Sequence, residues 1–243
     1  MGRLLLMTIS FLAMMIVSVS AAILPFNGQT TVDVANSYTI LAYPSDYVFY
    51  VVALIYLSIL YWIYKQWQMF AKKQFAITHV QSFLFTISMV LSIVWIYYWQ
   101  NSQFIIACMI LVFSTLALAG MYLLLPEKNT MTTRLPISLY LAWLVLLIMF
   151  NLAILLVAAR WDGFGLSQPL WAVILLTVFV AIALHIRFHH YDPYFPILFI
   201  WFYLGIAVQN NFEELLVTTA ALFLSGVLLA GILFMRKKPR TIY

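Results

Sequence analysis

The chain has 243 residues, of which 66% are hydrophobic and only 8% are charged, and its mean hydropathy is +1.04. A soluble domain of this length could not bury so much apolar surface, so the composition excludes a soluble globular protein and predicts an integral membrane protein. The net charge of +5 comes from basic residues in short segments between apolar runs, which is typical of membrane topology and implies no nucleic-acid partner.

The first apolar run, Leu4–Ala22, follows the basic residue Arg3 and ends among small residues. It has two interpretations, a cleaved signal peptide or a retained first helix, and its near-span length favours retention. The polar connector 24–46 contains Asp33 and Asp46 but no lysine or arginine. Because it is longer than an ordinary connection, we expect either a functional lid or a mobile loop.

The second predicted span, Tyr47–Tyr64, is rich in aromatic residues. Tyr47 and Phe49 open it, and aromatic side chains at the ends of a span are expected of any interfacial belt. Tyr56 lies in the middle, where a phenol needs a hydrogen-bond partner.

The third predicted span, Thr78–Tyr98, leads to two tryptophans on one helical face, because Trp95 and Trp99 are four residues apart. Ser88 and Ser92 continue this face into the membrane. Such a stripe has two interpretations: close packing of small residues against a neighbouring helix, or the wall of a pocket.

The fifth predicted span lies between Arg134 and Arg160 and has no charge inside it. Tyr140, Trp143 and Asn151 recur on one stripe at about 100° per residue. An amide in hydrocarbon is unfavourable without a partner, so Asn151 should turn this stripe toward other helices or a cavity. Either a structural helix contact or the wall of a pocket for an aromatic or amphipathic ligand fits the pattern.

Four further spans complete an all-α, polytopic transmembrane helix bundle of about eight helices, or seven if the first is cleaved. They are Phe104–Leu125, Pro169–Ile186, Tyr194–Val208 and Leu215–Met235.

The distribution of basic residues predicts that both termini, including the carboxy terminus, are cytoplasmic. In that orientation, all basic residues but one fall on the cytoplasmic side: Arg3, Lys65, Lys72, Lys73, Lys128, Arg134, Arg187, Arg236, Lys237, Lys238 and Arg240. Only Arg160 lies outside, close enough to an interface to reach water.

The predicted spans carry no residues that indicate catalysis. Charged residues inside the membrane mark proton relays and ion pathways, and none of the predicted spans has a charged residue at its middle. His185, His189, His190 and Asp192 have spacings that could hold a metal on a helix, but Pro193 and the charged surroundings predict a hydrated loop. We therefore assign no metal site and no catalytic residue, and we do not expect an enzyme.

Several segments, spread from the first connector to the end of the fifth span, resemble a known family. They are LPFNGQTT at Leu24–Thr31, YPSDYVF at Tyr43–Phe49, LIY at Leu54–Tyr56, WIYYW at Trp95–Trp99, RLPISLYLAW at Arg134–Trp143 and RWDGFG at Arg160–Gly165. Together they resemble the longer bacterial members of the tryptophan-rich sensory protein family, related to the translocator protein or peripheral-type benzodiazepine receptor.

The resemblance implies a five-helix translocator-like core over residues 1–158 and three additional transmembrane helices over 159–243 in the same membrane domain. It also implies a pocket near the connector after the first helix, in a family associated with porphyrins, sterol-like molecules and aromatic drugs. The candidate ligand-binding residues are Tyr47, Phe49, Tyr56, Trp95, Trp99, Tyr140, Trp143 and Asn151. The chain departs from the family pattern at Val52, where relatives have tryptophan, at Ser92, where they have asparagine, and in the connector, where Pro44 alone remains of a proline-rich motif.

These observations predict a protein of the bacterial inner (plasma) membrane that binds a hydrophobic or aromatic small molecule, as a sensor or a translocator. The alternative is a permease-like transport component that works with a partner protein, since Pro193 and Pro196 bracket the start of a short span and broken helices often line a transport path. The expected partners are the lipid bilayer, the small-molecule ligand, and either further copies of the chain or another membrane protein. No cofactor is assigned, and porphyrin or haem is a candidate ligand.

Overall fold

The computed structural model describes residues 1–26, 28–74, 77–127, 130–211 and 213–235. Within these residues the predicted all-α fold is confirmed, with eight long helices, and seven helical segments are long and apolar enough to cross a membrane. The long helices are α1 Gly2–Ile23, α3 Val51–Ala71, α4 His79–Gln100, α5 Phe104–Leu124, α6 Leu135–Ala158, α7 Gln168–His190, α8 Tyr194–Asn210 and α9 Leu215–Phe234. The shortest of these eight helices, α8, has 17 residues.

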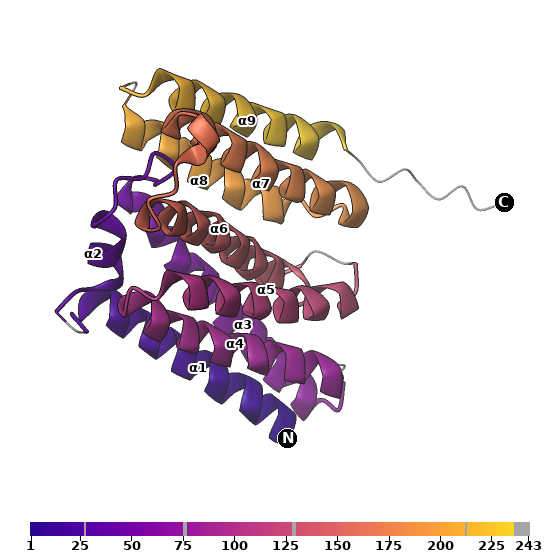
Figure 1. Ribbon diagram of the computed structural model, residues 1–243. Coiled ribbons are helices and arrows are strands. Elements are labelled where there is room, and N and C mark those ends of the chain that lie inside the picture. The colour runs from indigo at the N-terminus through magenta and orange to yellow at the C-terminus, as the bar shows by residue number, and fades with distance from the viewer. Residues whose placement is uncertain (27, 75–76, 128–129, 212, 236–243) are drawn as a thin grey trace. The chain divides into compact units, whose positions relative to one another are not determined.

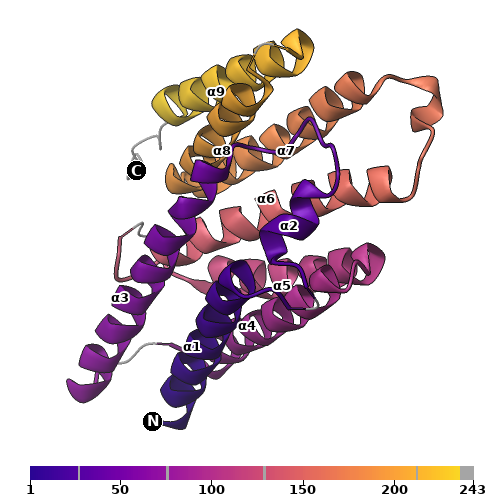
Figure 2. The same ribbon diagram turned by 90° about the vertical axis from the view of Figure 1, so that its left-hand side faces the viewer.

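The chain forms two compact units. Unit 1 comprises Met1–Ile40 and Val51–Trp161, in which α4 packs against α1 and α5, while α6 packs against α5 and α3 (Figure 1). A short helix, α2 Thr31–Asn36, contacts α1 and α4 (Figure 2).

Unit 2 comprises Leu41–Tyr50 and Asp162–Tyr243, in which α7, α8 and α9 pack side by side. Residues 41–50, which join the end of the first connector to the start of the second predicted span, belong to this unit. They end in a 3-10 helix, η1 Asp46–Tyr50, that contacts α8. The connector therefore contains one short helix, α2, and leads into another, η1.

Polar residues fix the points at which helices begin. At the start of α4, the Thr78 hydroxyl accepts from the Gln81 backbone N–H at 3.2 Å, and the Gln81 side chain accepts from the Thr78 N–H at 2.8 Å. Thr30 and Asp33 form the same reciprocal pair at the start of α2. These bonds satisfy N–H groups that have no partner within the helix.

The second span is longer than predicted from its apolar run. The apolar run predicts an end at Tyr64, but α3 continues to Ala71 because its polar residues have partners on other segments of unit 1. The Trp67 indole N–H donates to the Thr8 hydroxyl at 3.0 Å, and the Gln66 amide donates to the Thr132 carbonyl at 3.3 Å.

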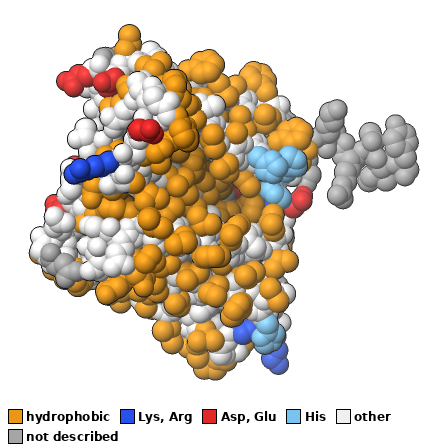
Figure 3. All heavy atoms as spheres, viewed as in Figure 1, with side chains coloured by type: hydrophobic (Ala, Val, Ile, Leu, Met, Phe, Trp, Pro, Cys, Tyr) orange, Lys and Arg blue, Asp and Glu red, His pale blue; other side chains and the backbone are white. Residues whose placement is uncertain are grey.

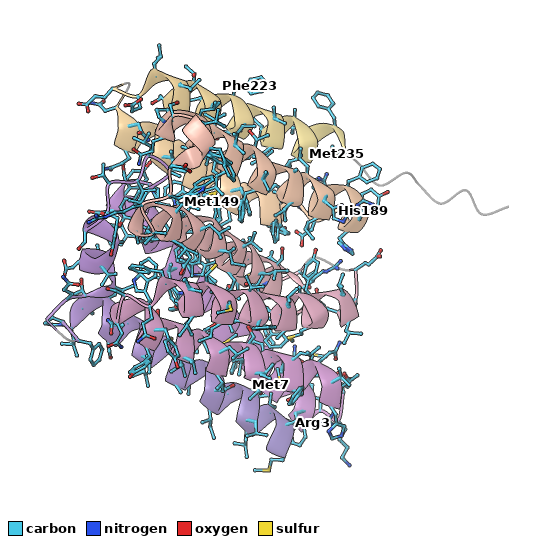
Figure 4. All side chains as sticks on the ribbon, in the orientation of Figure 1. Arg3, Met7, Met149, His189, Phe223 and Met235 are labelled. Atoms are coloured by element: carbon cyan, nitrogen blue, oxygen red, sulfur yellow. The ribbon has the colours of Figure 1, made fainter. Side chains whose placement is uncertain are left out.

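The prediction of a hydrated loop at the histidine cluster is wrong. Helix α7 continues through His190. The ring centroids of His185 and His189 lie 4.1 Å apart on this helix, where His189 is seen in Figure 4. Arg187 is buried in the same turns because it donates to two carbonyls near the end of α9, Gly231 and Ile232. The described residues contain no group of three or more histidine, cysteine or acidic side chains placed to hold a metal.

The surface is mostly apolar, as expected of a protein that faces lipid. Hydrophobic side chains cover most of the face in Figure 3. The large apolar residues that are exposed include Phe83 on α4 and Phe223 on α9. The basic tail on which the cytoplasmic carboxy terminus was predicted, Arg236, Lys237, Lys238 and Arg240, lies outside the described residues, as does Lys128.

Candidate functional site

A hydrogen bond between two of the candidate residues joins α4 to α6 in unit 1. The Trp95 indole Nε1 donates to the Asn151 side-chain oxygen at 3.2 Å, and the Asn151 amide donates to the Leu147 carbonyl at 2.8 Å. Asn151 is 0% exposed and Trp95 is buried. The amide is therefore directed into the protein and fixes the orientation of the indole.

Trp99 extends this contact toward the connector. Its ring centroid lies 5.8 Å from that of Trp95 and 5.7 Å from that of Phe150. Its indole N–H donates to the Thr31 carbonyl at 3.2 Å, and Gln100 donates to the Ala21 carbonyl at 3.3 Å. The start of α2 is thus held against the end of α4.

Tyr140 connects α6 to a group of hydroxyls deeper in the unit. Its hydroxyl donates to Ser92 at 3.2 Å and lies 3.7 Å from the sulfur of Met14 on α1. Ser92 and Ser88 are both within 3.1 Å of the Ser114 hydroxyl on α5. The network therefore runs continuously from α6 through α4 to α5.

The remaining two candidates of unit 1 are also buried. The Tyr56 hydroxyl donates to Ser18 on α1 at 2.8 Å, and its ring meets Phe11 edge to face at 6.0 Å. Trp143 is buried on α6, between the turns that carry Tyr140 and Asn151. We call these six residues the aromatic seam: Tyr56, Trp95, Trp99, Tyr140, Trp143 and Asn151.

Tyr47 and Phe49 lie in unit 2 and pack on α8. The Tyr47 ring meets the Trp201 ring edge to face at 5.5 Å, and the Phe49 ring meets Phe202 at 6.4 Å. Tyr47 is 37% exposed. These two residues therefore form an aromatic cluster with α8, whereas the other six candidates belong to unit 1.

Sequence reasoning missed several partners of the seam. Ser114 was hidden in an apolar run, and Ser18, Met14, Thr31 and Gln100 carry no pattern that relates them to α4 or α6. The one signal was the pair of hydroxyls at Ser114 and Thr115 within this apolar run, because a buried hydroxyl needs a partner.

The chemistry of the seam is apolar and aromatic, with its polar groups paired to one another. Asn151, Trp95, Tyr140 and Tyr56 each have a partner within the protein, and none of the six side chains carries a charge at neutral pH. Nearby in α2, two hydrogen bonds from Thr30 lower the pKa of the Asp33 carboxyl below its ordinary value. Side chains of this kind can contact a flat apolar ligand through stacking and burial.

Comparison with known proteins gives a match at the level of the family. The sequence model of the family described as TSPO-like protein matches residues 4–234, which is nearly the whole chain. No curated protein and no solved structure matches the chain.

Proposed function

Because the chain belongs to the TSPO-like protein family, we propose that this multi-pass membrane protein binds a hydrophobic or aromatic small molecule at the aromatic seam. The ligand is porphyrin-like or sterol-like, and the protein acts as a sensor or translocator rather than as an enzyme. In the proposed orientation the protein lies in the bacterial inner (plasma) membrane with its carboxy terminus in the cytoplasm.

The observation that carries this proposal is the bond between Trp95 and Asn151. It holds one indole in place 5.8 Å from a second, Trp99, and none of the six side chains of the aromatic seam is charged. A ligand that enters between these helices would contact aromatic groups whose orientation is already fixed by hydrogen bonds, at little entropic cost. The ligand would therefore be recognised by shape and aromatic contact more than by charge.

A titration with a porphyrin tests the proposal. Purified full-length protein is titrated with protoporphyrin, and binding is followed by the absorbance of the porphyrin itself, so that the readout does not depend on which tryptophans remain. We expect Trp95→Leu and Asn151→Leu to raise Kd at least about tenfold, which corresponds to ~1.4 kcal/mol.

The matched control is Trp171→Leu in unit 2. The Trp171 indole N–H donates to the Gly163 carbonyl at 2.8 Å. Trp171→Leu therefore removes an indole ring and one hydrogen bond, as Trp95→Leu does, but outside the aromatic seam. Equal affinity in the wild type and both seam variants, or an equal loss in the control, would contradict a ligand site at the seam.

A second candidate function, a permease-like transport component, is favoured by the backbone around α8. The Ser45 N–H donates to the Gly205 carbonyl at 3.2 Å, and the Trp201 indole donates to the Val48 carbonyl at 3.2 Å. Irregular backbone beside a short apolar helix is typical of segments that line a transport path. Uptake of labelled porphyrin into vesicles that contain the protein, above that of protein-free vesicles, would support transport, and binding without uptake would support a sensor.

A further inference from the structure

The start of α6 carries a buried arginine, two of whose guanidinium nitrogens have no hydrogen-bonded acceptor among the described residues. Arg134 is 1% exposed, and its guanidinium carbon lies 3.8 Å from the centre of the Tyr122 ring. In the part of the chain that the structure describes, neither its Nε nor its Nη1 has a hydrogen-bond partner. The aromatic face stabilises the charge but uses none of these N–H donors.

Three more polar atoms in this end of unit 1 are buried and without a hydrogen-bond partner among the described residues. They are the Trp62 indole Nε1 and the Gln66 side-chain oxygen on α3, and the Ser138 hydroxyl on α6. Trp62 and Gln66 are one turn apart on their helix, and Arg134 and Ser138 are one turn apart on theirs.

One hydrogen bond brings the two helices together at this point. Gln66 donates through its amide nitrogen to the Thr132 carbonyl, two residues before Arg134, at 3.3 Å. The end of α3 therefore lies beside the start of α6, and the helices pack against each other. Gln66 and Arg134 occupy the outer level of this junction, and Trp62 and Ser138 lie one turn further in.

The unpaired groups are mostly donors. Arg134 offers three N–H donors, one on Nε and two on Nη1, while Trp62 offers one N–H and Ser138 one O–H. Gln66 alone offers an unpaired acceptor that cannot also donate. An arginine cannot lose its proton to escape burial, so an uncompensated guanidinium is highly unfavourable. Arg187, the buried arginine of unit 2, shows the usual solution, because it donates to two carbonyls.

We propose that Arg134, Trp62, Ser138 and Gln66 form a binding site for a phosphate group. A phosphate supplies several acceptor oxygens and a negative charge, which complement clustered donors around an arginine. The N-terminal end of α6 adds a favourable dipole. Since the end of a membrane-spanning helix lies at the depth of the lipid head groups, the phosphate belongs to an anionic lipid or to a small soluble phosphate.

Thermal unfolding of the full-length protein in detergent tests this site. Three additions are compared: phosphatidylglycerol in mixed micelles, inorganic phosphate, and diacylglycerol, which has the same chains without the phosphate. We expect phosphatidylglycerol to raise the unfolding midpoint by about 3 °C or more, since a ligand that binds only the folded state stabilises it, and diacylglycerol to have no effect. An equal rise with inorganic phosphate would identify a soluble phosphate as sufficient.

Variants assign the effect to the site. Arg134→Gln should abolish the shift, and Arg134→Lys should keep only part of it because lysine lacks the planar set of donors. Ser138→Ala removes one donor with little change in volume and should reduce the shift, which keeps the proposal testable if Arg134→Gln fails to fold. The matched control is Lys65→Gln, which removes one positive charge from the same end of α3 outside the site. No shift with either phosphate compound, or a shift that Arg134→Gln and Ser138→Ala leave intact, would overturn the proposal.

Discussion

The indole Nε1 of Trp95 and the side-chain oxygen of Asn151 lie 3.2 Å apart, although the two residues are 56 positions apart in the sequence. Both groups are buried, so if this hydrogen bond were broken, the surrounding apolar residues could not supply either group with a new partner. The bond therefore fixes the register of α4 against α6 as well as the orientation of the indole.

The first prediction is that Trp95 and Asn151 are energetically coupled. Asn151→Leu leaves the indole N–H without an acceptor and should lower the free energy of unfolding by about 1–3 kcal/mol. In a double-mutant cycle with Trp95→Phe, we expect a coupling energy of about 0.5–1.5 kcal/mol, measured by reversible unfolding in mixed micelles. Additive effects of the two changes would contradict a bond that matters for stability.

The second prediction concerns the hydroxyl of Ser114, which bonds to α4 rather than only to its own helix. It donates to the Ser88 carbonyl at 3.0 Å and also meets the Ser88 and Ser92 hydroxyls. Ser114→Ala should therefore cost about 0.5–1.5 kcal/mol in the same unfolding assay.

Its control is Ser58→Ala. Among the described residues, the buried Ser58 hydroxyl bonds only to the Ile55 carbonyl of its own helix, so the loss of stability in Ser58→Ala should be smaller. If both variants lost the same free energy of unfolding, the hydrogen bonds of Ser114 to α4 would contribute no more stability than a bond within one helix.

Much of the fold is predictable from sequence because apolar length is a direct physical requirement of the bilayer. The fourth span was expected at Phe104–Leu125 and is found at Phe104–Leu124, since Pro126 and polar residues end its apolar run. The ends of α3 and α7 were not predictable in this way. Their polar residues, such as Gln66 and Arg187, remain helical because distant carbonyls accept their hydrogen bonds.

The candidate site was predictable only in part, and for the same reason. The stripe of Tyr140, Trp143 and Asn151 follows from helical periodicity, which correctly directs Asn151 into the protein. Periodicity cannot identify the partner on another helix, so the bond to Trp95 was not predicted. Nor could it show that Tyr47 and Phe49 pack with α8, because that contact joins segments more than 150 residues apart.

The third prediction concerns Gly205 on α8, where segment 41–50 lies against the helix. A Cβ at this position would overlap the Val48 side chain and would lie 3.2 Å from Pro44 Cβ. Gly205→Ala should therefore displace the segment and lower the free energy of unfolding by about 1–3 kcal/mol. Limited proteolysis of residues 41–50 provides a second measurement, with faster cleavage expected in the variant.

Gly226 on α9 is the matched control, because a Cβ there meets nothing within 4 Å. Since alanine is the better helix former, Gly226→Ala should be neutral or stabilising by up to about 1 kcal/mol. Equal effects of the two substitutions would show that the close approach of segment 41–50 does not constrain α8.

The fourth prediction is a pH dependence at the start of α2. The Thr30 N–H and hydroxyl bond to the Asp33 carboxylate at 2.8 and 2.7 Å and lower its pKa below the ordinary 3.8. Because the folded-state pKa is lowered, the bonds are fully formed above pH 3.8 and are lost as the pH falls through the lowered value. The Thr30 amide signal in NMR should therefore titrate with a midpoint below 3.8, and the titration should vanish in Asp33→Asn. A midpoint at or above 3.8 would show that the carboxylate does not hold the helix start.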